Sequence, residues 1–429
     1  MTATPTAPSG TPSETRPDST ASTRPFDWYR SLPKPGRRAF LGAFGGYGLD
    51  AYDFQVLPLG LTAIAAYFHL SKGESGLLTT VTLVVSALGG ILAGALIDRI
   101  GRSRTLMITI GTYALFTALC GFASSYPMLL TFRALQGLGF GGEWAAGAVL
   151  VAEYASAKYR GRTVAFVQAS WAVGWGLAVI VATISLDHLS GGLSWRVLFW
   201  TGALPGLLLF FLRRGVQDAP SPARQVGAPR IPVSGVFRGG LGRITLFASL
   251  MATGVQGGYY TIATWLPTYL KEERHLTIVG TGSYLSLLIG GAFLGYLCGG
   301  YVTDWLGRRK AIGLFGILSG AILFSYIHIP AADNHVLLVL GFPLGFCFSA
   351  IFSGFGSYLA ELYPREVRGT GQSFTYNVGR AVGAFFPTAV GFEAGSKGLG
   401  DALVYGTVGY ALAVLALFGL PETRRIELL

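Results

Sequence analysis

Two carboxylates lie close together in one long apolar stretch of the sequence, at Asp50 and Asp53. Residues at positions i and i+3 share one face of a helix. Neighbouring carboxyl groups in apolar surroundings repel each other and are costly to ionise, which favours the protonated form of at least one. We therefore expect a proton-carrying site here, with Asp53 a stronger candidate than Asp50. The alternative is a permanent pair with an arginine from a neighbouring helix.

A second apolar stretch carries Arg133 and Glu143, about 15 Å apart along a helix axis. Arginine keeps its proton, so Arg133 must meet a carboxylate, either Asp53 or that of a bound molecule. We expect a proton on the acidic residues to free Arg133 for binding a substrate carboxylate together with Arg380. Glu143 follows a run of glycines. It either takes a proton or locks its helix to the helix of Asp53, and the sequence leaves both readings open.

Arg380 lies in the middle of a third apolar stretch, on the helix face that also carries Tyr376 and Asn377. A guanidinium group binds a carboxylate through two parallel hydrogen bonds. These residues are expected to bind substrate, and the alternative is an interhelical hydrogen-bond network. Gln256 and Tyr259, one turn deeper than the aromatic end of another stretch, are expected to contact the same substrate.

The elements that hold these residues must be membrane-spanning helices. Of the 429 residues, 51% are hydrophobic and only 12% are charged, about half the charged share of a soluble domain. A bilayer is crossed by roughly 20 helical residues. Twelve apolar stretches are long enough, at 37–66, 75–97, 105–124, 127–151, 163–186, 195–213, 243–270, 281–303, 311–329, 336–360, 370–391 and 401–420.

An internal repeat divides these stretches into two halves. The segment from Gly94 to Arg102 recurs from Gly300 to Arg308, and Ala152-Glu153 recurs as Ala360-Glu361. The sequence therefore predicts an all-α membrane protein with twelve transmembrane helices in two pseudo-symmetric six-helix bundles. The expected parts are a disordered tail (1–25), a first bundle (26–213), a cytoplasmic central loop (214–242), a second bundle (243–420) and a cytoplasmic tail (421–429).

The charge distribution predicts the orientation. The net charge is +11, but the basic residues occupy short loops and not one stripe, which argues against nucleic-acid binding. With the N-terminus in the cytoplasm, most of the 32 Lys and Arg residues fall on the cytoplasmic side. The outer side keeps Lys72, Arg196, Lys271, Arg274 and Lys397. We expect a multi-pass protein of the plasma (inner) membrane with both termini cytoplasmic.

The sequence contains no motif that indicates a metal or cofactor site. The three cysteines are widely spaced within apolar stretches, and the five histidines lie in or near the expected outer loops. No phosphate-binding loop, nucleophile motif or zinc motif occurs. We expect no metal, no cofactor and no enzyme activity, since the central break is too short for a catalytic domain.

The segment Gly94-Ala-Leu-Ile-Asp98-Arg99-Ile-Gly101-Arg102 resembles the signature loop of the major facilitator superfamily. The surroundings of Asp50, Glu143 and Arg380 are similar to organic acid:proton symporters, namely sialate, lactate/monocarboxylate and aromatic-acid carriers. This resemblance implies a cytoplasmic gate in which Asp98 meets the start of helix eleven. The gate residues would be Gly94, Asp98, Arg99, Gly101, Arg102, Asp304, Arg308, Glu153 and Arg368.

The function expected from these features is proton-coupled symport of a small organic anion by alternating access, with protons as the coupling ion. We expect a carrier that works as a monomer in lipid. A facilitator or proton symporter of neutral sugars or polyols would use the same fold. A multidrug exporter fits less well because the expected cavity holds two arginines. A membrane enzyme or sensor is the remaining alternative.

Overall fold

The computed structural model describes residues 27–100, 102–141, 154, 160–213, 233–364 and 366–423. All regular secondary structure in these ranges is helical. The helices of the first half are α1 (Asp27–Arg30), α2 (Lys34–Phe68), α3 (Lys72–Ile100), α4 (Arg102–Cys120), α5 (Tyr126–Phe140), α7 (Arg160–His188) and α8 (Gly192–Arg213). Those of the second half are η1 (Val233–Phe237), α9 (Leu241–Glu272), α10 (Ile278–Leu306), α11 (Arg308–His328), η2 (Ala331–Asp333), α12 (Asn334–Glu361), α13 (Arg368–Gly383), α14 (Phe385–Lys397), α15 (Leu399–Ala402), α16 (Val404–Ala416) and η3 (Leu417–Gly419).

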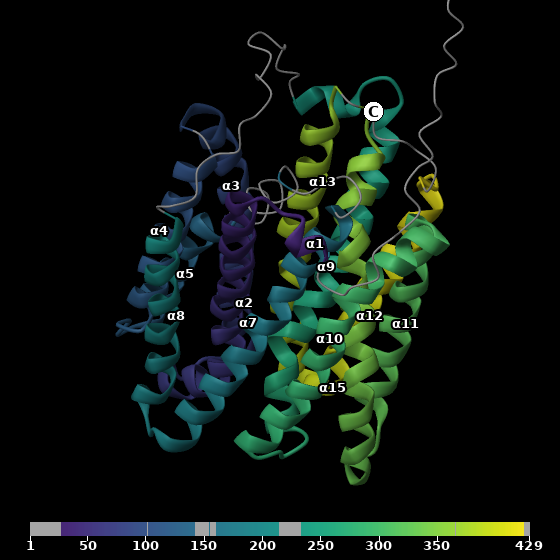
Figure 1. Ribbon diagram of the computed structural model, residues 1–429. Coiled ribbons are helices and arrows are strands. Elements are labelled where there is room, and N and C mark those ends of the chain that lie inside the picture. Colours follow the sequence, from purple (N-terminus) through teal and green to yellow (C-terminus); the bar gives the residue numbers. More distant parts are fainter. Residues whose placement is uncertain are drawn as a thin grey trace, which may run out of the picture.

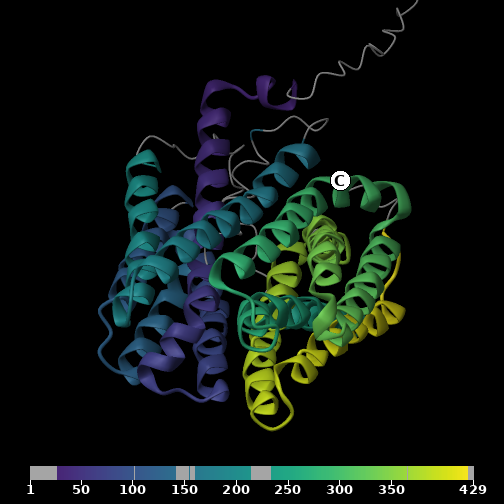
Figure 2. The ribbon, with the colours of Figure 1, turned by 90° about the horizontal axis from the view of Figure 1, so that it is seen from below.

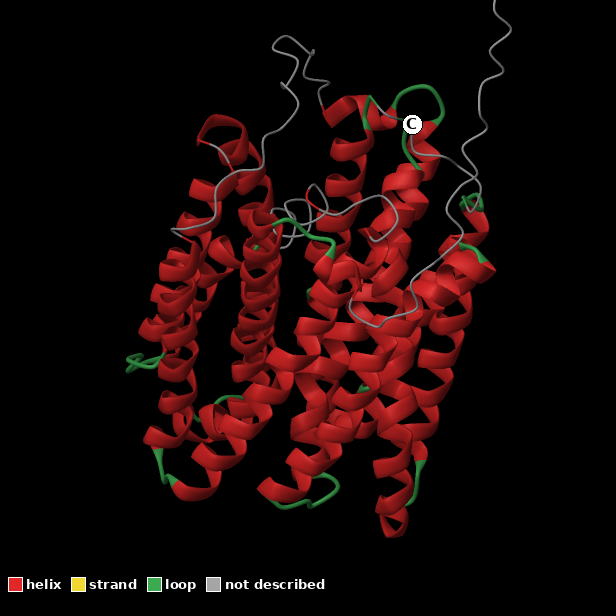
Figure 3. Cartoon of the chain, viewed as in Figure 1, coloured by secondary structure: helices red, strands yellow, loops and turns green. Residues whose placement is uncertain are grey.

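The helices form two bundles that stand side by side, one from α2 to α8 and one from α9 to α16 (Figures 1 and 3). We call them the N-terminal and the C-terminal bundle. In the described residues, six helices are long and apolar enough to cross a membrane. The predicted all-α architecture of two bundles is thus confirmed. Each predicted span coincides with helical residues of the structure. For the fourth span, 127–151, the structure describes the helix only as far as Phe140.

The eleventh predicted span differs from the structure because its helix is interrupted. α13 ends at Gly383 and α14 begins at Phe385, with Ala384 between them. Pro387 follows, and proline removes one backbone hydrogen-bond donor from a helix. The interruption therefore leaves backbone acceptors near Ala384 available to a neighbouring helix.

Both bundles use glycine for close helix contact. A Cβ atom at Gly137 or Gly141 of α5 would press against backbone carbonyls of α3, at Thr82 and Ser86. In the other bundle, Gly345 of α12 meets a carbonyl of α10 in the same way. Such close packing holds transmembrane helices together where no hydrophobic effect acts between them. Close contacts of this kind hold α3 against α5 and α10 against α12, so the side chains on these helices are held on closely packed elements.

The bundles contact each other toward one end of the molecule, which we call the Lys72 end; the opposite end, where α2 begins, is the tail end. α3 lies against α13 and α14, and α7 lies against α10, as the view along the helices shows (Figure 2). Lys72 pairs with Glu272 at 3.4 Å across the boundary. A Cβ atom at Gly76 would come within 2.5 Å of the Pro387 carbonyl. The halves are therefore closely apposed from the middle to the Lys72 end.

Candidate functional site

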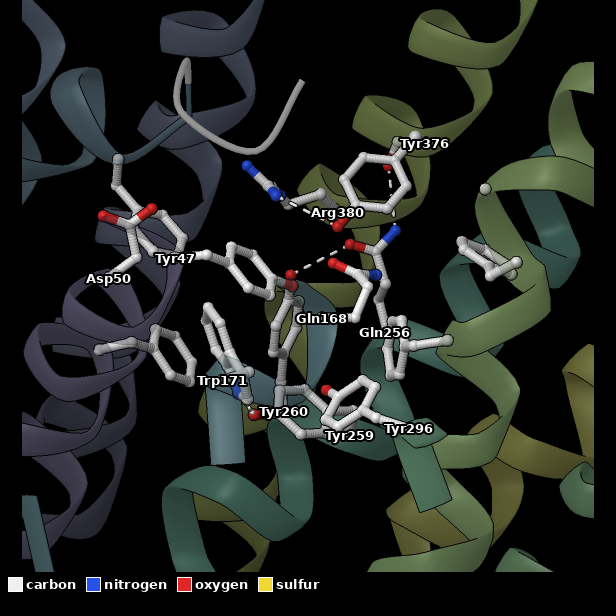
Figure 4. Close-up of a pocket in the computed structure, with 15 residues that line it drawn as sticks. Tyr47, Asp50, Gln168, Trp171, Gln256, Tyr259, Tyr260, Tyr296, Tyr376 and Arg380 are labelled. Carbon is white, nitrogen blue, oxygen red and sulfur yellow. Dashed lines mark hydrogen bonds between the residues drawn. The ribbon is translucent and has the colours of Figure 1, made fainter. Parts of the chain in front are cut away.

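A cavity lies between the two bundles near the middle of the molecule (Figure 4). Its space, including the part open to solvent, is about 650 Å³. The N-terminal bundle lines it with Tyr47, Asp50, Phe54, Phe140, Gln168 and Trp171. The C-terminal bundle lines it with Gln256, Tyr259, Tyr260, Tyr296, Phe352, Phe355, Gly356, Tyr376 and Arg380. The cavity is thus strongly aromatic, with one cation and one carboxyl group.

Arg380 is the cation of this cavity. Its side chain is buried, and Nη2 donates to the hydroxyl oxygen of Tyr376 at 3.3 Å. Nε has no hydrogen-bond partner among the residues that the structure describes. A buried guanidinium group with an unused donor is costly, and a carboxylate would satisfy it. The geometry suits the capture of an anion that enters the cavity.

Gln256 organises the wall beside Arg380. Its Nε2 donates to the backbone carbonyl of Tyr376 at 3.0 Å, and its Oε1 accepts from the hydroxyl of Tyr260 at 3.0 Å. Both ends of this carboxamide are therefore engaged by protein groups. Gln256 thus ties α9 to the backbone of α13 and holds the hydroxyl of Tyr260 beside the cavity (Figure 4).

Aromatic side chains from both bundles close the cavity toward the Lys72 end. Trp171 of α7 donates from Nε1 to the hydroxyl of Tyr259 on α9 at 2.6 Å. Phe54 and Tyr260 also meet across the boundary, with ring centroids 6.0 Å apart. These contacts place flat apolar surfaces around Arg380, a combination that suits a small planar anion.

The two aspartates of α2 have different surroundings. Both are buried, but Asp50 lines the cavity, whereas Asp53 lies one turn further, inside the N-terminal bundle. Thr117 lies with its hydroxyl 3.2 Å from Asp53 Oδ2 and 2.8 Å from the carbonyl of Tyr113. The side of Asp53 facing α8 is closed by Gly202, where a Cβ atom would strike Oδ1.

Arg133 is joined to Asp53 by a chain of hydrogen bonds and not by a direct contact. Its Nη1 donates to Gln136 Oε1 at 2.5 Å, and Gln136 Nε2 donates to Thr117 Oγ1 at 2.7 Å. Arg133 is 1% exposed and does not line the cavity. Its Nε and Nη2 atoms have no hydrogen-bond partner in the described parts of the chain. The structure thus brings Arg133 near Asp53 but keeps it apart from Arg380.

The remaining predicted substrate residues divide between the cavity and its edge. Tyr259 and Tyr376 line the cavity with Gln256. Asn377 does not; its Nδ2 donates to the carbonyl of Ser373 at 2.9 Å, and its Oδ1 lies near Gly90 of the other bundle. Glu143 lies outside the described residues.

The structure describes only some of the residues that were predicted to form the cytoplasmic gate. Glu153 and Gly101 lie outside the described residues, and Gly94, Asp98, Arg99 and Arg102 are described only as helical backbone. In the C-terminal bundle, Arg308 pairs with Asp304 at 3.1 Å and with Glu361 at 3.3 Å. Arg368 donates weakly to the carbonyl of Tyr363 at 3.5 Å. These contacts lie within one bundle, at the tail end.

Several cavity residues had not been predicted as site residues, although the sequence contains a signal for them. Tyr47 and Phe54 follow helical spacing on the face of α2 that carries the predicted Asp50, and Gln168 and Trp171 follow it on α7. A search for polar and aromatic residues on shared faces would have found Tyr47 and Gln168. Phe140 gives no such signal, because only its neighbours in space identify it. In the described residues, no cluster of His, Cys, Asp and Glu could hold a metal ion.

Comparison with known proteins gives consistent matches along the chain. The sequence profile of the Major Facilitator Superfamily matches residues 43–387. A probable 4-methylmuconolactone transporter of Cupriavidus pinatubonensis is 39% identical over 94% of both chains. A cis,cis-muconate transport protein of Acinetobacter baylyi is 32% identical, covering 84% of this chain and 89% of its own. The crystal structure of a D-xylose-proton symporter superposes with a TM-score of 0.74 at 18% identity, over 90% of this chain and 98% of that one.

Proposed function

The chain belongs to the Major Facilitator Superfamily, and from that premise we propose that it is a proton-coupled symporter of a small organic acid. Membership makes it an integral membrane transporter of small molecules and not an enzyme. The substrate class is supported by the names of its relatives, which include transporters of a muconolactone and of muconate. Planar, unsaturated acids of that size would fit an aromatic cavity.

One observation carries this proposal, namely the buried Arg380 with its unsatisfied Nε inside an aromatic cavity. A carboxylate that binds Arg380 in the plane of the guanidinium group would supply the missing acceptor. The rings of Tyr260, Tyr376 and Trp171 would cover the faces of a flat substrate. The hydrogen bond from Tyr260 to Gln256 holds one of these rings in position before substrate arrives, and the bond from Gln256 to the Tyr376 carbonyl fixes the neighbouring helix.

The proton site in this proposal is the group of Asp50, Asp53 and Glu143. Thr117 supports a role for Asp53, since its single hydroxyl hydrogen can point to either of two acceptors. An ionised Asp53 would accept that hydrogen, which leaves Thr117 to accept from Gln136. A protonated Asp53 would donate to Thr117, whose hydrogen would then turn to the carbonyl of Tyr113. The protonation state of Asp53 would thus decide which acceptor the Thr117 hydroxyl uses, and Thr117 is linked to Arg133 through Gln136.

Coupling would follow from charge balance. Ionised Asp53 compensates Arg133 through Gln136 and Thr117, and a proton on Asp53 removes that compensation. One proton moving with one monoanion carries no net charge. The membrane potential, worth about 2.3 kcal/mol per charge per 100 mV, would then not oppose uptake.

Alternating access would be a rocking of the two bundles about the cavity. The described contacts between the halves close the Lys72 end, so this arrangement corresponds to access from the tail end. In the opposite arrangement, the predicted gate around Asp98, Asp304 and Arg308 would close. We place both termini in the cytoplasm, on the distribution of Lys and Arg, and propose a monomer in the plasma (inner) membrane.

Uptake into proteoliposomes tests the proposal. Thermal unfolding of the purified chain against small carboxylates, sugars and amino acids first selects a ligand, because ligand binding stabilises the folded state. Uptake of that ligand should rise with an inward proton gradient and fall when the gradient is collapsed. Arg380→Gln should abolish uptake of an acid. If neutral sugars or polyols are accumulated instead, and Arg380→Gln transports them normally, the organic-acid assignment is wrong.

A further inference from the structure

The guanidinium group of Arg380 faces an aromatic ring of the other bundle. Its Cζ atom lies 5.6 Å from the ring centroid of Phe140, the last described residue of α5. On its own helix, the same atom lies 5.0 Å from the ring centroid of Tyr376. A cation within about 6 Å of a ring face is attracted to the electron-rich ring. The contact with Phe140 crosses the boundary between the bundles, and the contact with Tyr376 does not.

Phe140 is held in a fixed position. Its ring stacks on that of Phe54, with centroids 5.9 Å apart and planes within 15°, and its other neighbour is Trp171 at 6.4 Å. Behind it, α5 is locked by glycines, since a Cβ atom at Gly139 would lie 2.6 Å from the carbonyl of Thr109 on α4. These contacts restrict where the Phe140 ring can lie relative to the guanidinium group.

Burial makes this contact stronger than one at a surface. Arg380 is 5% exposed and cannot give up its charge. Its Nη2 bond to Tyr376 is long, and its Nε lacks a partner in the described residues. Cation–π attraction is stronger when the cation is desolvated than when it lies at an exposed site.

We infer that Phe140 is a positioning residue for the proposed carboxylate site, and that its ring holds the Arg380 guanidinium in its place beside the cavity. This inference rests on the proposed function. It adds that the anion-binding group of the C-terminal bundle is oriented by the N-terminal bundle. The anion site is therefore complete only when the bundles adopt this relative position. A bound carboxylate neutralises the guanidinium and weakens its attraction to Phe140, which loosens one contact between the halves.

Three substitutions separate ring electrostatics from packing. Phe140→Leu removes the aromatic face, whereas Phe140→Tyr and Phe140→Trp keep one. We expect Phe140→Leu to raise the KM for a transported acid roughly tenfold, and the two aromatic variants to stay within about twofold of the wild type. The matched control is Phe132→Leu, on the same helix but outside the cavity and packed on Phe116. Equal KM values for Phe140→Leu and the wild type, or an equal loss in Phe140→Tyr, would overturn the inference.

A second measurement needs no substrate and so separates this inference from the proposed function. Thermal unfolding of the full chain in detergent is compared for Phe140→Leu, Arg380→Met and the double variant. The inference requires that Phe140→Leu destabilise the wild type more than it destabilises Arg380→Met. Phe132→Leu should have the same effect in both backgrounds. Additive effects of Phe140→Leu and Arg380→Met would exclude the contact, whatever the protein transports, while a wild type without acid uptake would refute only the proposed function.

Discussion

The hydroxyl of Thr80 on α3 donates to the backbone carbonyl of Ala384, at 2.6 Å, where the helix of α13 and α14 is interrupted. The same hydroxyl lies 2.7 Å from that of Thr388. A side chain of the N-terminal bundle thus satisfies an acceptor that the helix break exposes in the C-terminal bundle. Ala384 also lies one turn beyond Arg380, whose carbonyl accepts from the Ala384 amide at 2.9 Å. Arg380, the proposed anion-binding residue, and the contact that closes the Lys72 end are therefore adjacent along the chain.

We predict that Thr80→Val shifts the protein toward the arrangement in which the Lys72 end is open. A hydrogen bond is worth about 1 kcal/mol, so the ratio of closed to open forms should fall about fivefold. Spin labels on Ser124 and His335, in a background without the native cysteines, would report the separation of the bundles. Thr80→Ser, which keeps the hydroxyl, should give the wild-type distance distribution; the same shift in both variants would contradict this role.

We predict that Gly391→Ala obstructs closure at the Lys72 end. A Cβ atom there would strike the backbone carbonyl of Lys72 on the opposite bundle, and neither backbone can yield easily. Transport should fall at least about fivefold, because overpacking costs about 1–3 kcal/mol. Gly395→Ala on the same helix has nothing within 4 Å of its new Cβ atom and is the matched control. Normal uptake by Gly391→Ala would show that the bundles separate here at little cost.

Asp53→Asn and Arg133→Gln should each destabilise the protein more than the double variant does. Each single change removes one of two buried charges that are linked through Gln136 and Thr117, and breaking a buried pair costs about 3–5 kcal/mol, whereas the double change removes both charges. Thermal unfolding of the three variants in detergent measures this coupling. A double variant that loses as much stability as the two single variants combined would mean that Gln136 and Thr117 do not link the two charges.

The same variant tests proton coupling. Asp53→Asn cannot release a proton, so it should lose accumulation driven by a pH gradient. It should retain exchange of labelled for unlabelled substrate, which needs no net proton movement. Gradient-driven accumulation that survives in Asp53→Asn would move the coupling role to Asp50 or Glu143, and Asp50→Asn is the next variant to measure.

A fifth prediction concerns the tail end. The carboxylate of Glu422 accepts from the backbone amides of Arg308, Arg309 and Lys310, at 2.8, 3.4 and 3.3 Å, at the start of α11. An anion at a helix N-terminus is stabilising by about 0.3–1 kcal/mol, and capping adds about 1 kcal/mol. Glu422→Gln should lower the unfolding temperature by a few degrees. Glu393→Gln, at a more exposed pair with Lys397, should change it by less than one degree.

Composition and periodicity were sufficient to predict the helices, the two bundles and the pairing of Arg380 with Tyr376. Apolar length fixes the spans, and residues four apart on a helix are neighbours by geometry. The break at Ala384 could also have been expected, because Pro387 is visible in the sequence.

The division of roles between Asp50 and Asp53 could not be predicted. They lie about 60° apart around the helix, and only the rotation of α2 against its neighbours decides which of them lines the cavity. That rotation depends on side-chain packing across the whole bundle. The contact of Phe140 with Arg380 is beyond sequence reasoning for the same reason, since it joins positions far apart in the chain.

The hydrogen bond from Trp171 to Tyr259 has an optical consequence. The indole ring belongs to one half of the molecule and the phenol to the other, and both are buried beside the cavity between the bundles. Indole emission depends on the polarity around the ring and on hydrogen bonding at its nitrogen. When the halves part, water would replace the phenol as the hydrogen-bond partner of the indole. The emission wavelength of Trp171 is therefore expected to depend on the relative position of the two bundles.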